Sequence, residues 1–477
     1  MDHTVYNNPL VTRYATREMS EIFSEQHRIG LFRRLWLALA KGEQSLGLDI
    51  TDEQIAELEA YVDDINFDVA NAREKVTRHD VMAHIYAYGQ QCPKAAPIIH
   101  LGATSCYVTD NADMLIYRDA MRLVIDKVVA LMSRLADFAM EYRKMPTLGF
   151  THLQAAQLVT VGKRASLWLQ DFLMDFNNLS HVYDNMLLRG VKGTTGTQAS
   201  FLSLFDGDHA KVKALERYIT DYFGVKGAFP VSGQTYTRKE DYNILSALSM
   251  LAQSAYKFSQ DIRLLQSMKE IEEPFAKNQV GSSAMAYKRN PMRSERIGSI
   301  ARYLVSLPMN AAMTACTQGF ERTLDDSANR RIVMGEGFLA ADAILELLLN
   351  VTDGLVVYPK VIRKHLMEEL PFMATEVILM RCVKAGGSRQ ELHEKIRTHS
   401  MEAEKNVRLN GKRNDLIDRL KKDPAFAAVD DYDKILNPVN FIGRAPQQVE
   451  DFVKTYIRPV LKRYRGRYER FTGEINI

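Results

Sequence analysis

The sequence predicts an all-α protein built from three helical domains, and three observations support this class. Glycine and proline are sparse, with 26 and 14 residues among 477, so long stretches lack helix breakers. Apolar residues in these stretches recur at three- and four-residue steps, which is the period of a helix face. Strand-like alternation is scarce and short. The chain length favours roughly three domains at about 150 residues each.

Four long helices are expected along the chain. The first begins at Asn111, where Thr109 or Asp110 would cap its N-terminus. Each would have about 25 to 35 residues, well above the usual mean of about 11 or 12. Their predicted ranges are 111–145, 161–188, 239–273 and 332–357.

The helix pattern divides the chain into three domains with soft boundaries. Residues 1–111 would form an N-terminal helical domain, 112–357 a central bundle of long helices, and 358–477 a C-terminal helical domain. After Pro359 the predicted helices become shorter, with a break at Pro424.

The run AADAILELLLNV at residues 340–351 is apolar nearly all round. A helix of this kind must be covered on every side. The run therefore predicts the middle of a large bundle, forming a tetramer core that is shared between subunits.

Composition and charge exclude several classes of function. Hydrophobic residues make up 46% and charged residues 25%, which is typical of soluble globular proteins and argues against disorder. The net charge of +3 gives no reason to expect nucleic acid or a membrane surface as a partner. The four cysteines are scattered without a CxxC pair, which argues against a disulfide scaffold and fits a reducing compartment.

Targeting and membrane segments are not expected. The first 25 residues carry charges throughout, and Tyr303–Phe320 is too polar to span a bilayer. We therefore expect a soluble, cytoplasmic protein.

Familiar ligand motifs are weak or missing. Glycines at 193–196 and 335–337 lack the strand–turn–helix setting of a dinucleotide site, and the sequence has no Walker A or HExxH pattern. No cofactor and no metal are therefore expected. Residues 462–470 (KRYRGRYER) resemble a nucleic-acid patch, but we interpret them as a solvated helix face near the terminus.

Residues 281–296 (GSSAMAYKRNPMRSER) are the segment most suggestive of chemistry. A serine hydroxyl is a poor base unless nearby positive charge stabilises its alkoxide form. Lys288 and Arg289 could supply that charge and also hold an anionic substrate. The alternative is a flexible connector that leads into a basic helix start.

Two further segments could carry polar chemistry. His152 lies between two long helices and suits general acid–base work near neutral pH, although a lone loop histidine is more often merely solvated. Arg78-His79-Asp80 precedes the stretch HLGATS at 100–105, and a His–Asp neighbour pair is more commonly a surface feature.

Together these segments resemble the signature blocks of the fumarase/aspartase lyase superfamily. Residues 281–291 are similar to its loop GSSxMPxKxNP, with Ala286 in place of proline. Thr104-Ser105 and the stretch 151–154 match its two other blocks in the same order. Within the superfamily the chain resembles the adenylosuccinate lyases of the animal type over nearly its whole length.

The resemblance implies a β-elimination that releases fumarate from adenylosuccinate, giving AMP, and from SAICAR, giving AICAR. It implies that Ser282 is the general base that removes the proton from the succinyl carbon, and that His152 is the general acid that protonates the departing nitrogen. Lys288 and Asn290 would stabilise the carbanion intermediate. The resemblance adds His79 to the candidate catalytic residues, beside His152, Ser282 and Lys288.

The resemblance also implies a substrate-binding set rich in arginine, whose fork binds two oxygens at once. Partners would be small nucleotides and three further copies of the chain, because active sites in this superfamily are shared between subunits. The loop at 281–283 would close over the substrate as a lid. The implied contacts are Arg13, Tyr14, Arg78, His79, Asp80, Thr104, Ser105, Thr151, Gln234, Lys288, Asn290, Arg296, Arg322, Ser327 and Arg331.

Two alternatives remain open at this point. A sibling such as an argininosuccinate lyase would share the elimination blocks but bind no phosphate, and the arginines 13, 322 and 331 argue against it. The second alternative is a non-catalytic structural protein on the same scaffold. The intact set of Ser282, His152 and Lys288 argues against such a loss of activity.

Overall fold

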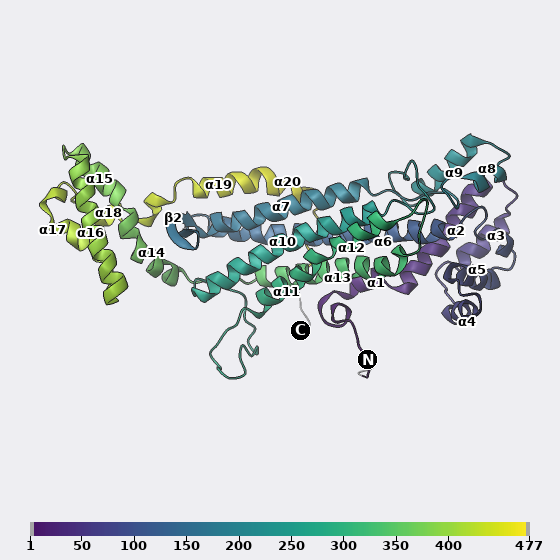
Figure 1. Ribbon diagram of the computed structural model, residues 1–477, viewed down its shortest axis with the longest axis horizontal. Coiled ribbons are helices and arrows are strands. Elements are labelled where there is room, and N and C mark those ends of the chain that lie inside the picture. The colour runs from purple at the N-terminus through teal and green to yellow at the C-terminus, as the bar shows by residue number, and fades with distance from the viewer. Residues whose placement is uncertain (1–3, 474–477) are drawn as a thin grey trace.

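The computed structural model describes residues 4–473 and is predominantly helical, which confirms the all-α class (Figure 1). The long helices run side by side along the long axis of an elongated molecule. These helices are α6 (Ser105–Glu141), α7 (Val161–Asn185), α10 (Lys239–Ser267) and α13 (Asp326–Thr352), with α11 (Met292–Ser306) packed against α10 and α13.

Short N-terminal helices gather around one end of this bundle. Helix α2 packs against α6, and α4 and α5 lie at the far end (Figure 1). The elements are η1 (Leu10–Tyr14), α1 (Arg17–Ile22), α2 (Glu25–Ser45), α3 (Asp52–Ala60), α4 (Phe67–Thr77), α5 (Asp80–Gln91) and η2 (Ala96–Ile98). Later in the chain, α8 (Ala199–Leu204) and α9 (His209–Tyr222) lie at this same end, with α9 packed against α2, while α12 (Pro308–Thr317) packs against α10 and α13 in the bundle (Figure 1).

The C-terminal helices begin at the opposite end, where they enclose a small core of their own. They are α14 (Pro359–Met373), α15 (Thr375–Lys384), α16 (Arg389–Asn410), α17 (Leu416–Lys422), η3 (Pro424–Phe426), α18 (Tyr432–Ile435) and η4 (Pro438–Phe441). The chain then returns along the bundle beside α7 (Figure 1). The returning elements are α19 (Ala445–Phe452), η5 (Val453–Ile457) and α20 (Arg458–Arg463).

The start of α6 corrects the sequence prediction, because the helix begins at Ser105 and not at Asn111. His100 and Gly102 adopt left-handed backbone angles, and Thr104 is extended, so the helix starts directly after them. Thr109 and Asp110 lie inside the helix, and neither caps it. The Asp110 carboxylate accepts hydrogen bonds from the Tyr236 amide and from Arg238 instead.

Other helix ends also differ from the predicted ranges. Helix α10 ends at Ser267 and α13 at Thr352, because the chain leaves each helix to form the strands β3 (Ile271–Glu272) and β4 (Val356–Val357). These strands pair with each other. Helix α7 ends at Asn185, and α13 begins at Asp326.

The segment between α6 and α7 is a β-hairpin, whereas the sequence suggested a loop. Strand β1 (Pro146–Thr151) pairs with β2 (Gln154–Thr160) in antiparallel register. His152 and Leu153 form the two-residue turn, with φ of 54° and 58°. Two positive φ angles are what a tight hairpin turn requires, and both side chains are exposed.

The run at 340–351 is covered by this chain alone. Residues 337–349 of α13 are all buried within the single chain. The run therefore needs no partner subunit to cover it, and the tetramer core shared between subunits stays a prediction. Any argument for partner subunits must come from side chains that stay exposed.

The basic C-terminal run at 462–470 is largely exposed, as expected, but most of it lies beyond the last helix. Helix α20 ends at Arg463, and the following residues fold back onto the bundle. Arg467 pairs with Asp126 at 2.7 Å and Arg470 with Glu18 at 2.8 Å, while Phe471 is buried in the main core. These arginines therefore fasten the chain end to α6 and α1.

Candidate active site

A cavity of about 760 Å³ opens where four helices begin. The N-terminal ends of α5, α6, α10 and α13 all contribute lining residues. Because the N-terminal end of a helix carries partial positive charge, this convergence favours anionic ligands. The lining includes seven of the predicted contacts: Arg78, His79, Asp80, Ser105, Arg322, Ser327 and Arg331.

His79 occupies the N-cap position of α5, where its Nδ1 accepts the amide of Met82 at 3.4 Å. An accepting Nδ1 leaves the proton of neutral imidazole on Nε2. Arg78, directly before it, has a φ of 54°, and this left-handed residue turns the chain from α4 into α5. Asp80 accepts from Arg331 at 3.2 Å, which joins this turn to α13.

Arg322, Gln234 and Thr104 form a short hydrogen-bonded chain at the cavity edge. Arg322 donates to the Gln234 amide oxygen at 2.8 Å, and Gln234 donates to the Thr104 hydroxyl at 3.3 Å. The Gln234 backbone N–H donates to the backbone carbonyl of Glu321 at 3.1 Å. Three segments far apart in sequence therefore meet here.

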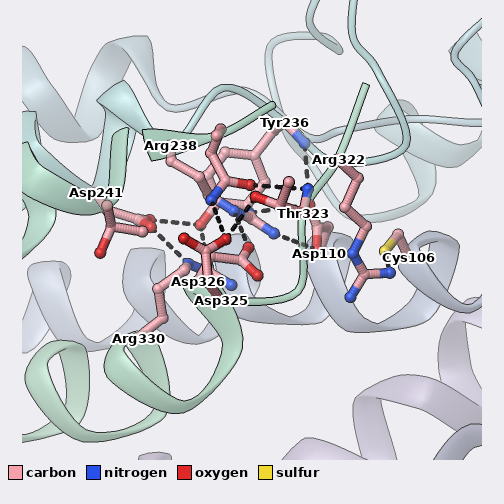
Figure 2. Close-up of polar contacts among 12 residues, drawn as sticks. Cys106, Asp110, Tyr236, Arg238, Asp241, Arg322, Thr323, Asp325, Asp326 and Arg330 are labelled. Atoms are coloured by element: carbon pink, nitrogen blue, oxygen red, sulfur yellow. Dashed lines mark hydrogen bonds and ion pairs between the residues drawn. The ribbon is translucent and has the colours of Figure 1, made fainter. Parts of the chain in front are cut away.

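A buried charge network forms one wall of the cavity, and Figure 2 shows its polar contacts. Arg238 binds both Asp110 oxygens, at 3.1 and 3.2 Å, and donates from Nε to Asp326 at 2.7 Å. These contacts tie together the first turns of α6, α10 and α13. A buried ion pair of this kind adds little net stability to the fold. Removing one partner costs about 3–5 kcal/mol, because the other charge is left buried and uncompensated. The pair therefore fixes the relative positions of the three helix ends.

Arg330 forms the second half of the network (Figure 2). It donates to Asp241 at 2.6 Å and to the Tyr236 hydroxyl at 2.5 Å. Burial alone would raise the pKa of Asp110, but the charges of Arg238 and Arg330 hold that pKa below its usual value. Burial also raises the pKa of the nearby Cys106 thiol to about 11.

The other predicted residues lie elsewhere in the chain. Helix α6 has 37 residues and therefore spans about 55 Å, with Ser105 at its first turn. The hairpin with Thr151 and His152 follows its last turn, so it lies at the opposite end of the bundle from the cavity (Figure 1). His152 is exposed there, at the hairpin tip.

The signature loop is also held away from the cavity. Gln266, in the last turn of α10, donates to the Arg289 carbonyl at 3.0 Å, and Asn290 donates to the Gly281 carbonyl at 2.8 Å. Helix α10 has 29 residues, about 44 Å, and Arg238 at its N-cap lines the cavity. A Cβ at Gly281 would lie 2.1 Å from the Lys288 carbonyl oxygen, so only glycine fits there.

Ser282 has the surroundings expected for a hydroxyl that becomes charged. Its Oγ accepts from the amides of Ala284 at 3.3 Å and Met285 at 3.1 Å. Two N–H donors aimed at one oxygen would stabilise negative charge on it. Lys288, in the same loop, is exposed.

Arg13, Tyr14 and Arg296 form a third group. Arg13 and Tyr14 belong to η1, and the Arg296 guanidinium lies 5.7 Å from the centre of the Tyr14 ring. Arg296 stands just over one turn into α11, which follows the signature loop. One chain therefore presents the predicted residues in separate groups: the cavity, the hairpin tip, and the region around α11.

Sequence reasoning missed several side chains that build the cavity. Arg28, Glu74 and Asp113 line it, and Arg238 and Arg330 hold its wall. No local pattern marks these residues, because their roles depend on contacts between distant helices. Within residues 4–473, no group of three or more His, Cys, Asp or Glu side chains could hold a metal ion.

Comparisons with known proteins agree with this architecture. A family model described as "Lyase" matches residues 15–305, and another described as "Adenylosuccinate lyase C-terminus" matches residues 371–452. Solved structures with the same fold include a 3-carboxy-cis,cis-muconate lactonizing enzyme of Pseudomonas putida and a fumarate lyase of Mesorhizobium sp. BNC1. Their TM-scores are 0.80 and 0.78, both at 22% identity, covering 94% of this chain and 99% and 100% of theirs.

The first match spans more than half of the chain, so the fold and the family together define a lyase. Adenylosuccinate lyases from two yeasts are similar at much higher identity. That of Saccharomyces cerevisiae is 52% identical over 97% of both chains, and that of Schizosaccharomyces pombe is 53% identical over 98% of this chain and 97% of its own. The relative from Schistosoma mansoni is 48% identical over 96% of both chains. The chain belongs to the adenylosuccinate lyase family.

Proposed function

We propose that this enzyme eliminates fumarate from adenylosuccinate to give AMP, and from SAICAR to give AICAR. The observation that carries the proposal is the cavity at the four helix N-terminal ends. Arg78, Arg322 and Arg331 line it together with Ser327, a set suited to phosphate and carboxylate groups.

In the proposed reaction, Ser282 removes the proton from the succinyl carbon beside a carboxylate. The electron pair delocalises onto that carboxylate, where Lys288 and Asn290 stabilise it. The bond from the neighbouring carbon to nitrogen then breaks, and His152 protonates the departing nitrogen. Two N–H donors already point at the Ser282 oxygen, which supports its role as the base.

The separation of the groups supports a site shared between subunits. The hairpin and the cavity are at opposite ends of a helix of about 55 Å, so no substrate of nucleotide size could touch both within one chain. A homotetramer that brings the three groups together from different chains would complete each site.

Exposed apolar side chains support such an assembly. Met309 and Met313 on α12 are 59% and 62% exposed, and Ile332 on α13 is 60% exposed. Met174 on α7 is 57% exposed. Apolar side chains along the bundle helices are typical of surfaces that partner subunits cover.

Two further expectations belong to this proposal. The division into domains at 1–111, 112–357 and 358–477 stays a prediction: the separate core between Ala374 and Ile435 supports a distinct C-terminal unit, whereas Val449, Val453 and Phe471 pack into the main core. A cytoplasmic location fits the four free cysteines. Within residues 4–473, no helix has the length and apolarity needed to cross a membrane.

The direct test is incubation of the purified protein with adenylosuccinate, SAICAR and argininosuccinate in parallel. Fumarate release is measured by its ultraviolet absorbance. Release from the first two substrates and not from the third is expected. Release from argininosuccinate alone would indicate the sibling activity, and release from none would indicate a non-catalytic protein.

A further inference from the structure

The segment Asn8–Thr16 carries Arg13 and Tyr14 but has little hydrophobic anchorage of its own. Leu10 is the one buried residue of η1, while Arg13 is exposed and Tyr14 half-buried. A single helical turn of this length is not stable in isolation. Its position must therefore be set by contacts at its two ends.

The first contact is made by the Asn8 side chain. Its Oδ1 accepts the amide of Leu10 at 2.9 Å, and its Nδ2 donates to Glu336 Oε1 on α13 at 2.9 Å. The second oxygen of Glu336 accepts from the Tyr303 hydroxyl on α11. Asn8 thus starts the turn and also fastens it to α13.

The second contact is made by the backbone of Thr16. Its amide donates to Asp342 Oδ2 at 2.7 Å, and Asp342 is completely buried. The other Asp342 oxygen faces Lys127 at 2.5 Å, and Lys127 also pairs with Glu346 at 2.7 Å. One lysine faces two carboxylates, so the Thr16 amide supplies the further donor that Asp342 needs.

The two contact points on α13 are Glu336 and Asp342. They are six residues apart, or about 9 Å along the helix axis. Between them, Arg13 and Tyr14 are held against α11, where Arg296 lies over the Tyr14 ring. We propose that Asn8 and Asp342 are positioning residues, which hold Arg13 and Tyr14 in register with Arg296 for binding the anionic substrate. This inference rests on the proposed function for the identity of that substrate.

The test changes the hydrogen bond between Asn8 and Glu336, first by one substitution and then by a second that reverses donor and acceptor. Asn8→Asp keeps the oxygen that caps Leu10 but places a second carboxylate against Glu336. We expect KM for adenylosuccinate to rise about tenfold with kcat nearly unchanged, because Arg13 and Tyr14 lose their place before chemistry begins. Adding Glu336→Gln restores an amide-to-carboxylate bond with donor and acceptor reversed, and should return KM close to its original value.

The matched control is Asn437→Asp. Asn437 also accepts the amide two residues ahead, that of Val439 at 3.2 Å, but it lies in the C-terminal helices. Its KM should not change. An unchanged KM in Asn8→Asp, or no recovery in the double variant, would overturn the positioning role.

Amide hydrogen exchange provides a readout that does not need turnover. Exchange across residues 9–16 should accelerate in Asn8→Asp and slow again in the double variant. Exchange that is equal in all variants would overturn the anchor itself. A wild-type protein that releases no fumarate would overturn the proposed function, and the exchange comparison would then decide the anchor alone.

Discussion

At the scale of single residues, Ser282 offers the most direct test of the proposed catalytic roles. Its hydroxyl accepts two backbone amides inside a loop that Gly281 and Asn290 close. Ser282→Ala should lower kcat by about three orders of magnitude or more with little change in substrate affinity, because the lost interaction is made in the transition state. Steady-state kinetics and binding of AMP check the two parts separately.

The neighbouring hydroxyl is the natural control for Ser282. Ser283 is exposed in the same loop, so Ser283→Ala removes the same kind of hydroxyl but leaves the Ser282 hydroxyl and its two amide donors in place. It should retain most of the wild-type kcat. A Ser282→Ala variant that keeps a tenth of the wild-type kcat would remove Ser282 from the role of base.

Arg331 tests anion recognition in the cavity. It lies on α13 beside Ser327 and pairs with Asp80 at 3.2 Å. Arg331→Lys keeps the charge but loses the planar fork, so KM for both succinyl substrates should rise about tenfold while kcat changes less. An equivalent exchange at Arg322 should act in the same direction.

Arg408→Lys is the control for this pair. Arg408 is exposed on α16, pairs with Glu404 at 2.9 Å, and is not among the residues that line the cavity. Its KM should match that of the wild type. Unchanged KM values in both Arg331→Lys and Arg322→Lys would assign these arginines to the fold or to a subunit interface.

At the scale of elements, α2 carries a buried acid that makes stability depend on pH. Glu43 is completely buried, and neither of its oxygens has a hydrogen-bond partner among the described residues. Burial raises the pKa of Glu43 from 4.5 to about 8. Between these values the folded carboxyl keeps a proton that the unfolded chain has released, so the free energy of unfolding falls as pH rises.

Glu43→Gln should remove this penalty. At pH 8 the variant should have a higher Tm than the wild type, and its free energy of unfolding should be larger by a value on the order of a few kcal/mol. At pH 4.5 the two proteins should have similar Tm values. Thermal unfolding at the two pH values measures the difference. Glu391→Gln, at an exposed position on α16, is the control and should show no such pH-dependent gain.

The elements also show what the sequence could predict. Helical periodicity located all four long helices, since their apolar faces repeat over many turns. It placed the start of α6 too late, because Asp110 is of a residue type that often caps helices. In the structure its carboxylate accepts hydrogen bonds from Arg238 instead. The hairpin was missed because β1 and β2 are short and only partly buried, so neither carries a clear alternating pattern.

At the scale of the whole molecule, the sequence predicted which residues belong to the candidate site, but not where in the fold they lie relative to one another. Local motifs marked Ser282 and His152, yet nothing in their spacing indicates that long helices hold them far from Ser105. The wall formed by Asp110, Arg238 and Asp326 has no local signal, because its members come from three different helices. Such contacts are visible only once the bundle is assembled.

The central claim is that each site takes its histidine and its serine from different chains. His152→Ala and Ser282→Ala should each be nearly inactive as pure tetramers, since every site then lacks one group. Denaturing the two together in equal amounts and refolding them should create sites with both groups intact. For random assembly this share is about a half times a half, or roughly a quarter of the wild-type activity.

Each variant refolded with itself is the control and should regain nothing. Native mass spectrometry shows whether mixed tetramers have formed. Fumarate release near a quarter of the wild-type rate in those mixtures is the result that the shared-site account predicts. Mixed tetramers that remain inactive would show that His152 and Ser282 act from one chain, and would contradict it.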